Sequence, residues 1–207
     1  MPVDLLRSIS KCFLILLILC AARLSGAASV DDAMSMLHSS IDQILSVAYS
    51  GQGNENLSAR VRPLLERIFA LDLVTRQAMG PGWRQFSPAD KKRITGLFSE
   101  LMLRTYSARV VGTERPKITY GTPVELASDR TEVPSRVTTS TSNEPIAVVY
   151  RLIKLPVGWR IYDVLIEGVS FVSNYRAQFD EIIHRGGAPA VIRALEAKLA
   201  APANSNS

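Results

Sequence analysis

The stretch from Gly158 to Ile183 constrains the fold more than any other, because it reads as a strand, a one-glycine turn and an amphipathic helix in direct succession. Strand side chains alternate between two faces. This alternation predicts one face with Trp159, Ile161, Asp163 and Leu165, and another with Arg160, Tyr162, Val164 and Ile166. Gly168 is the expected break, and Ser170 is the expected N-cap of the helix. Because both strand faces are largely apolar, the helix should fold over the sheet around an apolar interior.

The first half of the chain has the pattern of linked helices. Apolar residues recur at helical spacing in four stretches, 30–49, 58–69, 72–79 and 87–111. Ser87 followed by Pro88 is the clearest helix start, since serine commonly caps a helix and proline fits its first turn. We therefore expect several short, connected helices before Gly112.

The pattern changes after Gly112, where prolines separate runs rich in Val, Ile, Thr and Tyr. Five strands are predicted, at 117–120, 124–127, 132–141, 146–155 and 158–166. No helical stretch separates them, so the sheet should be antiparallel, with the doubly apolar run 146–155 at its centre. Helical patterns return at Val169 and, after a break at Arg185–Gly187, at Pro189. The predicted fold class is α+β: a helical N-terminal half packed on a curved antiparallel sheet, closed by C-terminal helices around an apolar cavity.

Residues 1–28 have the order of a cleaved secretory signal. Arg7 and Lys11 precede an apolar run from Cys12 to Ala22, and small residues follow up to Ala28. The apolar run is shorter than the about 20 residues that a membrane-spanning helix needs. We expect cleavage at about residue 28, a single domain at 29–201 and a disordered tail at 202–207.

The mature protein is expected to be exported, free of cysteine and only mildly basic. Both cysteines, Cys12 and Cys20, lie in the predicted signal, so a disulfide or a cysteine nucleophile is excluded after cleavage. An exported domain without disulfides favours a periplasmic location. Cleavage also removes three basic residues and one acidic residue, which reduces 24 basic and 19 acidic side chains to 21 and 18. This small excess fits solvated helix faces better than a nucleic-acid partner.

Few residues are suited to catalysis or metal binding. His38 and His184 belong to no ligand-spaced motif, and the chain has no phosphate-binding glycine loop or serine-nucleophile elbow. We therefore predict no cofactor, no metal and no enzymatic activity. One enzyme hypothesis stays open, in which Asp163 acts as a general base inside an apolar cavity. The competing hypothesis gives Asp163 a structural role as a hydrogen-bond acceptor.

Two segments carry a resemblance to a known family. The specific one is GWRIYDVLIEGVS at 158–170, and the looser one is LDLVTRQAMGPGWRQFSPADKKRITGLFSELMLRTYSARV at 71–110. They resemble the periplasmic phospholipid-binding proteins of the Mla pathway, the MlaC-like or toluene-tolerance auxiliary proteins. The departures are the adjacency of Gly158 and Trp159, Leu71 in place of an aromatic residue, and an additional Pro81–Gly82 turn. The resemblance extends over about residues 30–198.

This resemblance implies a lipid-binding carrier that shuttles phospholipid through the periplasm. Its expected partners are an outer-membrane lipoprotein complex and an inner-membrane ABC transporter complex. A related branch is associated with hopanoid biosynthesis, so a hopanoid-associated lipid carrier is a second hypothesis. A cone-pocket enzyme that uses Asp163 and an interaction adaptor with a filled core are a third and a fourth.

Large apolar side chains at the junction of helices and sheet are the candidate lipid-binding residues. The pattern provides more apolar lining than a thin two-layer domain needs, although periodicity alone does not separate a cavity from a filled core. The predicted lipid-binding residues are Val74, Ala78, Met79, Trp83, Phe98, Leu101, Met102, Tyr106, Tyr150, Leu152, Ile161, Val164, Val169, Phe171, Val172 and Tyr175.

Overall fold

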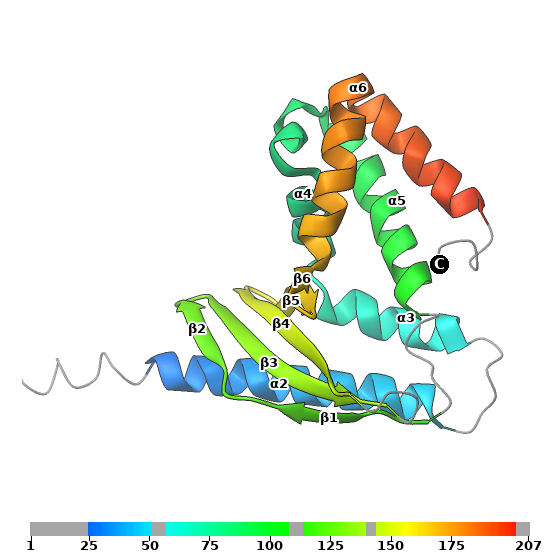
Figure 1. The fold of residues 1–207 in the computed structure, drawn as a ribbon. Helices are drawn as coiled ribbons and strands as arrows, with labels where there is room; N and C mark the ends of the chain where they lie inside the picture. Colours follow the sequence, from blue (N-terminus) through cyan, green and yellow to red (C-terminus); the bar gives the residue numbers. More distant parts are fainter. Residues whose placement is uncertain (1–24, 51–56, 108–113, 140–143, 202–207) are drawn as a thin grey trace, which may run out of the picture.

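The computed structural model describes residues 25–50, 57–107, 114–139 and 144–201. The fold is α+β, as predicted, with helices arranged around a six-stranded antiparallel sheet (Figure 1). The helices are α2 (Ser25–Ala48), α3 (Leu57–Ile68), α4 (Leu71–Met79), the 3-10 helix η1 (Gly80–Gln85), α5 (Pro88–Ser107) and α6 (Phe171–Ala200). Residues 25–28 of the predicted signal lie in the first turn of α2, while residues 1–24 and the predicted tail at 202–207 lie outside the described residues.

The sheet has the strand order β1-β3-β4-β5-β6, and β2 pairs with β3 on the same side as β1. The strands are β1 (Lys117–Tyr120), β2 (Val124–Ala127), β3 (Arg130–Thr138), β4 (Ile146–Leu155), β5 (Gly158–Ile166) and β6 (Val169–Ser170). The prediction that residues 146–155 form a central strand is confirmed, because β4 pairs with both β3 and β5. Strand β3 begins two residues before its predicted start, and β6 was not predicted.

A β-bulge in β5 corrects the predicted alternation of its side chains. Leu152 pairs with Ile161 and Arg151 pairs with Asp163, so Tyr162 is an extra residue without a partner in β4. From Asp163 onward, the odd-numbered residues of β5 therefore face the side of the sheet opposite to Trp159 and Ile161. The inner face of the sheet therefore carries Val148, Tyr150 and Leu152 of β4 with Trp159, Ile161, Val164 and Ile166 of β5. Asp163 and Leu165 lie on the outer face, because a bulge re-aims the side chains that follow it.

The turn from β5 into α6 follows the prediction closely. Glu167 and Gly168 both have positive φ, 49° and 77°, as a two-residue hairpin turn requires. Ser170 caps α6, and its hydroxyl accepts a hydrogen bond from Ser173 N at 3.0 Å. The predicted break near residue 186 is a sharp kink within α6, where Gly187 has φ 57°, and the second arm of the helix runs back past α5 (Figure 1).

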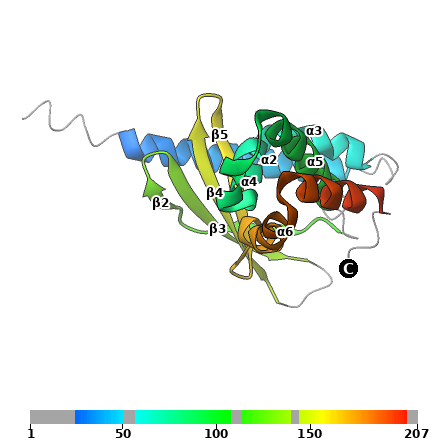
Figure 2. The ribbon, with the colours of Figure 1, turned by 90° about the horizontal axis from the view of Figure 1, so that it is seen from above.

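Two apolar cores lie on either side of the junction between helices and sheet. The helical core joins α4, α5 and α6, while the sheet core joins α2 and α3 to the inner face. Phe69 and Leu71, where α3 passes into α4, pack against both cores. Residues of α2, including Leu37 and Ile44, pack in the sheet core with the inner face, and in the view from above α2 passes beneath the β4–β5 hairpin (Figure 2). The middle of α3 is joined to α5 by an Arg62–Glu100 ion pair, which holds the pKa of the Glu100 carboxyl below its usual value.

Two glycine substitutions should separate tight packing from open helix surface. A Cβ at the buried Gly82 would lie 2.8 Å from Ile183 Cγ2 in the helical core, so Gly82→Ala should lower the free energy of unfolding by about 1–3 kcal/mol. Gly96 lies on the exposed side of α5, where a Cβ meets no atom within 4 Å. Gly96→Ala should instead raise stability by up to about 1 kcal/mol through helix propensity. Urea unfolding measures both, and an equal effect at the two positions would contradict this packing.

Candidate functional site: an apolar cavity between sheet and helices

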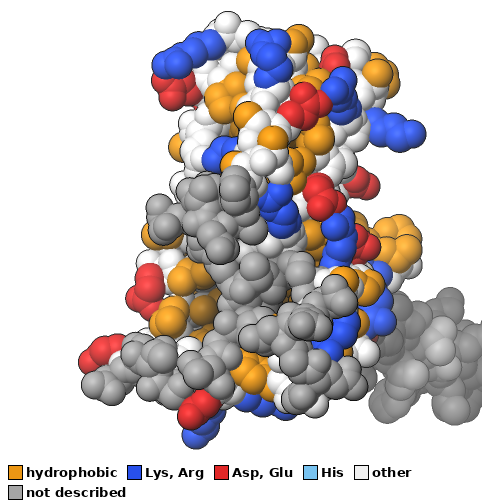
Figure 3. Space-filling model, turned by 90° about the vertical axis from the view of Figure 1, so that its right-hand side faces the viewer, with side chains coloured by type: hydrophobic (Ala, Val, Ile, Leu, Met, Phe, Trp, Pro, Cys, Tyr) orange, Lys and Arg blue, Asp and Glu red, His pale blue; other side chains and the backbone are white. Residues whose placement is uncertain are grey.

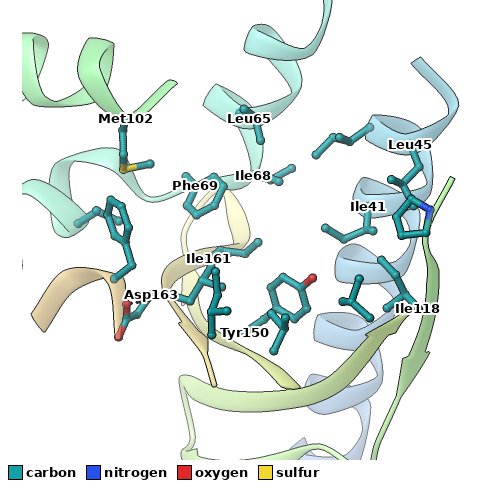
Figure 4. Close-up of a pocket in the computed structure, with 18 of the residues that line it drawn as sticks. Ile41, Leu45, Leu65, Ile68, Phe69, Met102, Ile118, Tyr150, Ile161 and Asp163 are labelled. Atoms are coloured by element: carbon teal, nitrogen blue, oxygen red, sulfur yellow. Dashed lines mark hydrogen bonds between the residues drawn. The ribbon is translucent and has the colours of Figure 1, made fainter. Parts of the chain in front are cut away.

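A cavity of about 630 Å³ lies between the inner face of the sheet and helices α2 and α3, and it extends to the ends of α4, α5 and α6 (Figure 4). This volume is within the range of about 300–1,000 Å³ typical of ligand sites. The lining residues are Ile41, Ile44, Leu45, Tyr49, Leu65, Ile68, Phe69, Val74, Met102, Leu103, Glu114, Pro116, Ile118, Val137, Thr139, Val148, Tyr150, Ile161, Tyr162, Asp163, Val164, Ile166, Val169, Ser170, Phe171 and Asn174. Most of them are apolar, so the cavity suits an apolar ligand.

Regular secondary structure positions this lining. On the sheet, Tyr150 pairs with Val164 and Val148 with Ile166, which puts all four side chains on the inner face. On α2, Ile41, Ile44 and Leu45 follow at helical spacing and point toward that face. Much of the lining, including Leu65, Tyr150 and Ile161, belongs to the sheet core, so the cavity lies within that core.

Polar groups in the cavity are few. Tyr150 lies at its floor, where burial raises the pKa of the phenol above its usual value while a hydrogen bond with Ser135 acts in the opposite direction. Its hydroxyl is therefore neutral at physiological pH. Among the lining residues that the structure describes, the charged ones are Glu114 and Asp163, and both are acidic.

Asp163 is buried and fully engaged in hydrogen bonds. Its Oδ2 accepts from Ser170 Oγ at 2.6 Å and from Arg151 Nη1 at 3.4 Å. Its Oδ1 accepts from the backbone N–H groups of Val164 at 2.9 Å and Val172 at 3.1 Å. The carboxylate thus ties β5 to the first turn of α6, where the helix dipole also favours negative charge. These contacts match the structural role weighed from the sequence.

The described residues contain no group of three or more His, Cys, Asp or Glu side chains placed to bind a metal ion. None of the helices in the described ranges is long and apolar enough to cross a bilayer.

Comparison with known proteins identifies the family. The model of the MlaC protein family matches residues 38–197. The chain belongs to the MlaC family. A similar solved structure is that of a phospholipid-binding protein from Ralstonia solanacearum, determined in complex with a phospholipid. It matches with a TM-score of 0.70 and 26% sequence identity over 80% of this chain and 96% of that chain. No curated protein sequence matches the chain significantly.

The sixteen predicted lipid-binding residues are divided between the cavity and the packed cores of this MlaC family member. The cavity lining contains Val74, Met102, Tyr150, Ile161, Val164, Val169 and Phe171. Eight others lie outside the lining. Those buried in the helical core are Ala78, Met79, Phe98, Leu101 and Val172, and those packed against that core are Trp83 and Tyr175. Leu152 is buried in the sheet core. The side chain of Tyr106 lies outside the described part of the structure. Whether any of the sixteen contacts lipid stays a prediction.

Aromatic packing explains why part of the predicted lining forms ordinary core. Phe98 of α5 lies with its ring centroid 5.0 Å from that of Tyr175 and 5.4 Å from that of Phe179, both in edge-to-face geometry. Tyr175 and Phe179 of α6 thus pack against α5. The lining that the prediction missed comes from α2, α3 and the inner face, including Ile41, Leu65 and Ile118. The helical periodicity around Ile41 and Leu65 was visible in the sequence, but it did not reveal which sheet face they meet.

Replacement of Asp163 should test its structural role in this MlaC family member. Asp163→Asn removes the charge and turns an NH₂ group toward a donor, so we expect a loss of about 2–4 kcal/mol in the free energy of unfolding. Asp32→Asn, at an exposed position of α2, is the matched control and should change stability by less than about 0.5 kcal/mol. Thermal and urea unfolding measure the difference. A stable Asp163→Asn variant would show that the carboxylate does not hold α6 to the sheet.

Proposed function

We propose that this protein is a periplasmic lipid-binding carrier that shuttles phospholipid between an outer-membrane lipoprotein complex and an inner-membrane ABC transporter complex. The observation that carries the proposal is the apolar cavity between the inner face of the sheet and α2 and α3. Membership of the MlaC family and similarity to a phospholipid-bound structure support it. The signal-like segment at 1–28 supports export to the periplasm.

Such a carrier must shield the acyl chains of its ligand from water. Burial of each CH₂ group is worth about 0.8 kcal/mol, so a phospholipid crosses water only when its chains are covered. The cavity offers an apolar lining for this purpose, and the proposed chain contacts include Val74, Met102, Tyr150 and Val164.

The cavity reaches the protein surface, where a headgroup has room. Ile166 and Val169 line the cavity and are nevertheless 50% and 63% exposed. Seen from the right of Figure 1, basic and acidic side chains are interspersed over the molecule, with hydrophobic side chains exposed among them (Figure 3). A ligand with buried chains and a solvated headgroup fits this arrangement.

The contacts of Asp163 do not favour an enzyme. A general base needs a lone pair directed at a substrate, whereas the Asp163 oxygens accept bonds from Ser170, Arg151 and two backbone N–H groups. We therefore propose binding without bond chemistry.

Native mass spectrometry of the exported protein tests the function. We expect a bound mass that organic extraction identifies as phospholipid, because the cavity should retain a cellular lipid through purification. Extraction of a hopanoid would identify a hopanoid as the cargo in place of phospholipid. A folded protein with only its apo mass, unchanged after incubation with phospholipid vesicles, would contradict the carrier function.

A cavity-filling substitution should lower lipid occupancy. Val164 is half-buried and faces the cavity from β5, so Val164→Trp places an indole where a chain would lie. Val157→Trp, in the exposed β4–β5 hairpin turn at 71% exposure, is the matched control. Native mass spectrometry should show less than about half the wild-type occupancy for Val164→Trp and unchanged occupancy for Val157→Trp, with both variants folded by circular dichroism. Equal occupancy in the two variants would remove Val164 from the binding site.

A further inference from the structure

One wall of the cavity is a seam between a helix and the edge of the sheet. Strand β1 hydrogen-bonds to β3 on one side and is the terminal strand of the sheet, while α2 lies beside it. The side chains of Ile41 and Leu45 on α2 and of Ile118 on β1 line the cavity at this seam (Figure 4). A ligand that passed between α2 and β1 would therefore enter the cavity directly.

An ion pair and an aromatic contact cross this seam, in addition to apolar packing in the sheet core. Arg115, just before β1, forms an ion pair with Asp42 of α2 at 3.2 Å, and the two side chains are 47% and 72% exposed. Farther along, the His38 ring packs on the Tyr120 ring with centroids 4.0 Å apart. Among the described residues, no backbone hydrogen bond joins α2 to β1. The exposed ion pair contributes little to stability, so the closure depends mainly on the His38–Tyr120 contact and on the packing of Ile41 and Tyr120 against the sheet core.

The other walls are closed more firmly. The strands of the sheet are joined by continuous backbone pairing. The start of α4 is joined to β5 by a hydrogen bond from Ala70 N to Ile161 O at 2.9 Å. The start of α6 is joined to β5 through Asp163. The cavity already reaches the surface at Ile166 and Val169, where a headgroup has room. Among the described residues no backbone hydrogen bond crosses the α2–β1 seam, so the seam is easier to open than these three walls.

We propose that acyl chains enter and leave the cavity sideways, through the seam between α2 and β1, when the Asp42–Arg115 ion pair releases. This inference rests on the proposed carrier function. Opening the seam disturbs neither the strand pairing nor the buried Asp163 contacts, so the rest of the fold is preserved during exchange.

Charge reversal tests the ion pair. Asp42→Arg sets two guanidinium groups against each other, and it should raise the rate of lipid uptake by about 2–5-fold. The probe is a pyrene-labelled phospholipid in vesicles of phosphatidylethanolamine and phosphatidylglycerol. The double variant Asp42→Arg/Arg115→Asp restores an ion pair and should return the rate to the wild-type value. Glu196→Arg breaks the exposed Arg93–Glu196 pair between α6 and α5, away from the cavity, and should leave the rate unchanged.

A reversible cross-link tests the seam itself. Cysteines are introduced at Asp42 and Arg115 in the exported protein, and a mass measurement first checks that the predicted signal at 1–28, which contains Cys12 and Cys20, has been removed. A short thiol-cleavable bis-methanethiosulfonate reagent then joins the two positions. We expect the uptake rate to fall at least about 10-fold and to recover when a reductant cleaves the link. The same reagent across cysteines at Arg93 and Glu196 should have no effect.

The results separate this inference from the function on which it rests. Uptake at the wild-type rate in the cross-linked protein would overturn the seam as the entrance and leave the carrier function standing. Failure of the wild-type protein to take up any lipid would overturn both.

Discussion

The buried carboxylate of Asp163 joins the two halves of this molecule. It accepts hydrogen bonds from Ser170 Oγ, Val172 N, Val164 N and Arg151 Nη1, and so fixes the start of α6 against β5. The helical core and the sheet core lie on either side of this junction. The junction also places the start of α6 beside the cavity, which it lines through Ser170, Phe171 and Asn174.

The bulge at Tyr162 makes this junction possible. Without the extra residue, the alternation along β5 would put Asp163 on the same face as Ile161, inside the sheet core. With it, Val164 and Ile166 continue the apolar inner face while Asp163 meets α6. One inserted residue thus supplies both an apolar cavity wall and a polar anchor.

The sequence predicted the elements well and their tertiary partners less well. Hydrophobic periodicity and proline spacing placed β1, β2, β4 and β5 at the observed residues, because each strand is bounded by strong turn signals. The cap at Ser170 and the turn at Gly168 were also found, since both are local. The bulge was missed because it depends on pairing with β4, and no local residue type marks it. For the same reason the predicted lipid-binding residues include Phe98 and Tyr175, which pack against each other outside the cavity lining.

The central claim is that the space between the inner face and helices α2 and α3 holds acyl chains. The most direct measurement is a crystal structure of the protein purified from cells without delipidation. We expect elongated ligand density between the inner face and α2 and α3, in contact with Tyr150 and Val164. Density confined to the surface, or a cavity filled by the protein's own side chains in a folded crystal, would contradict it.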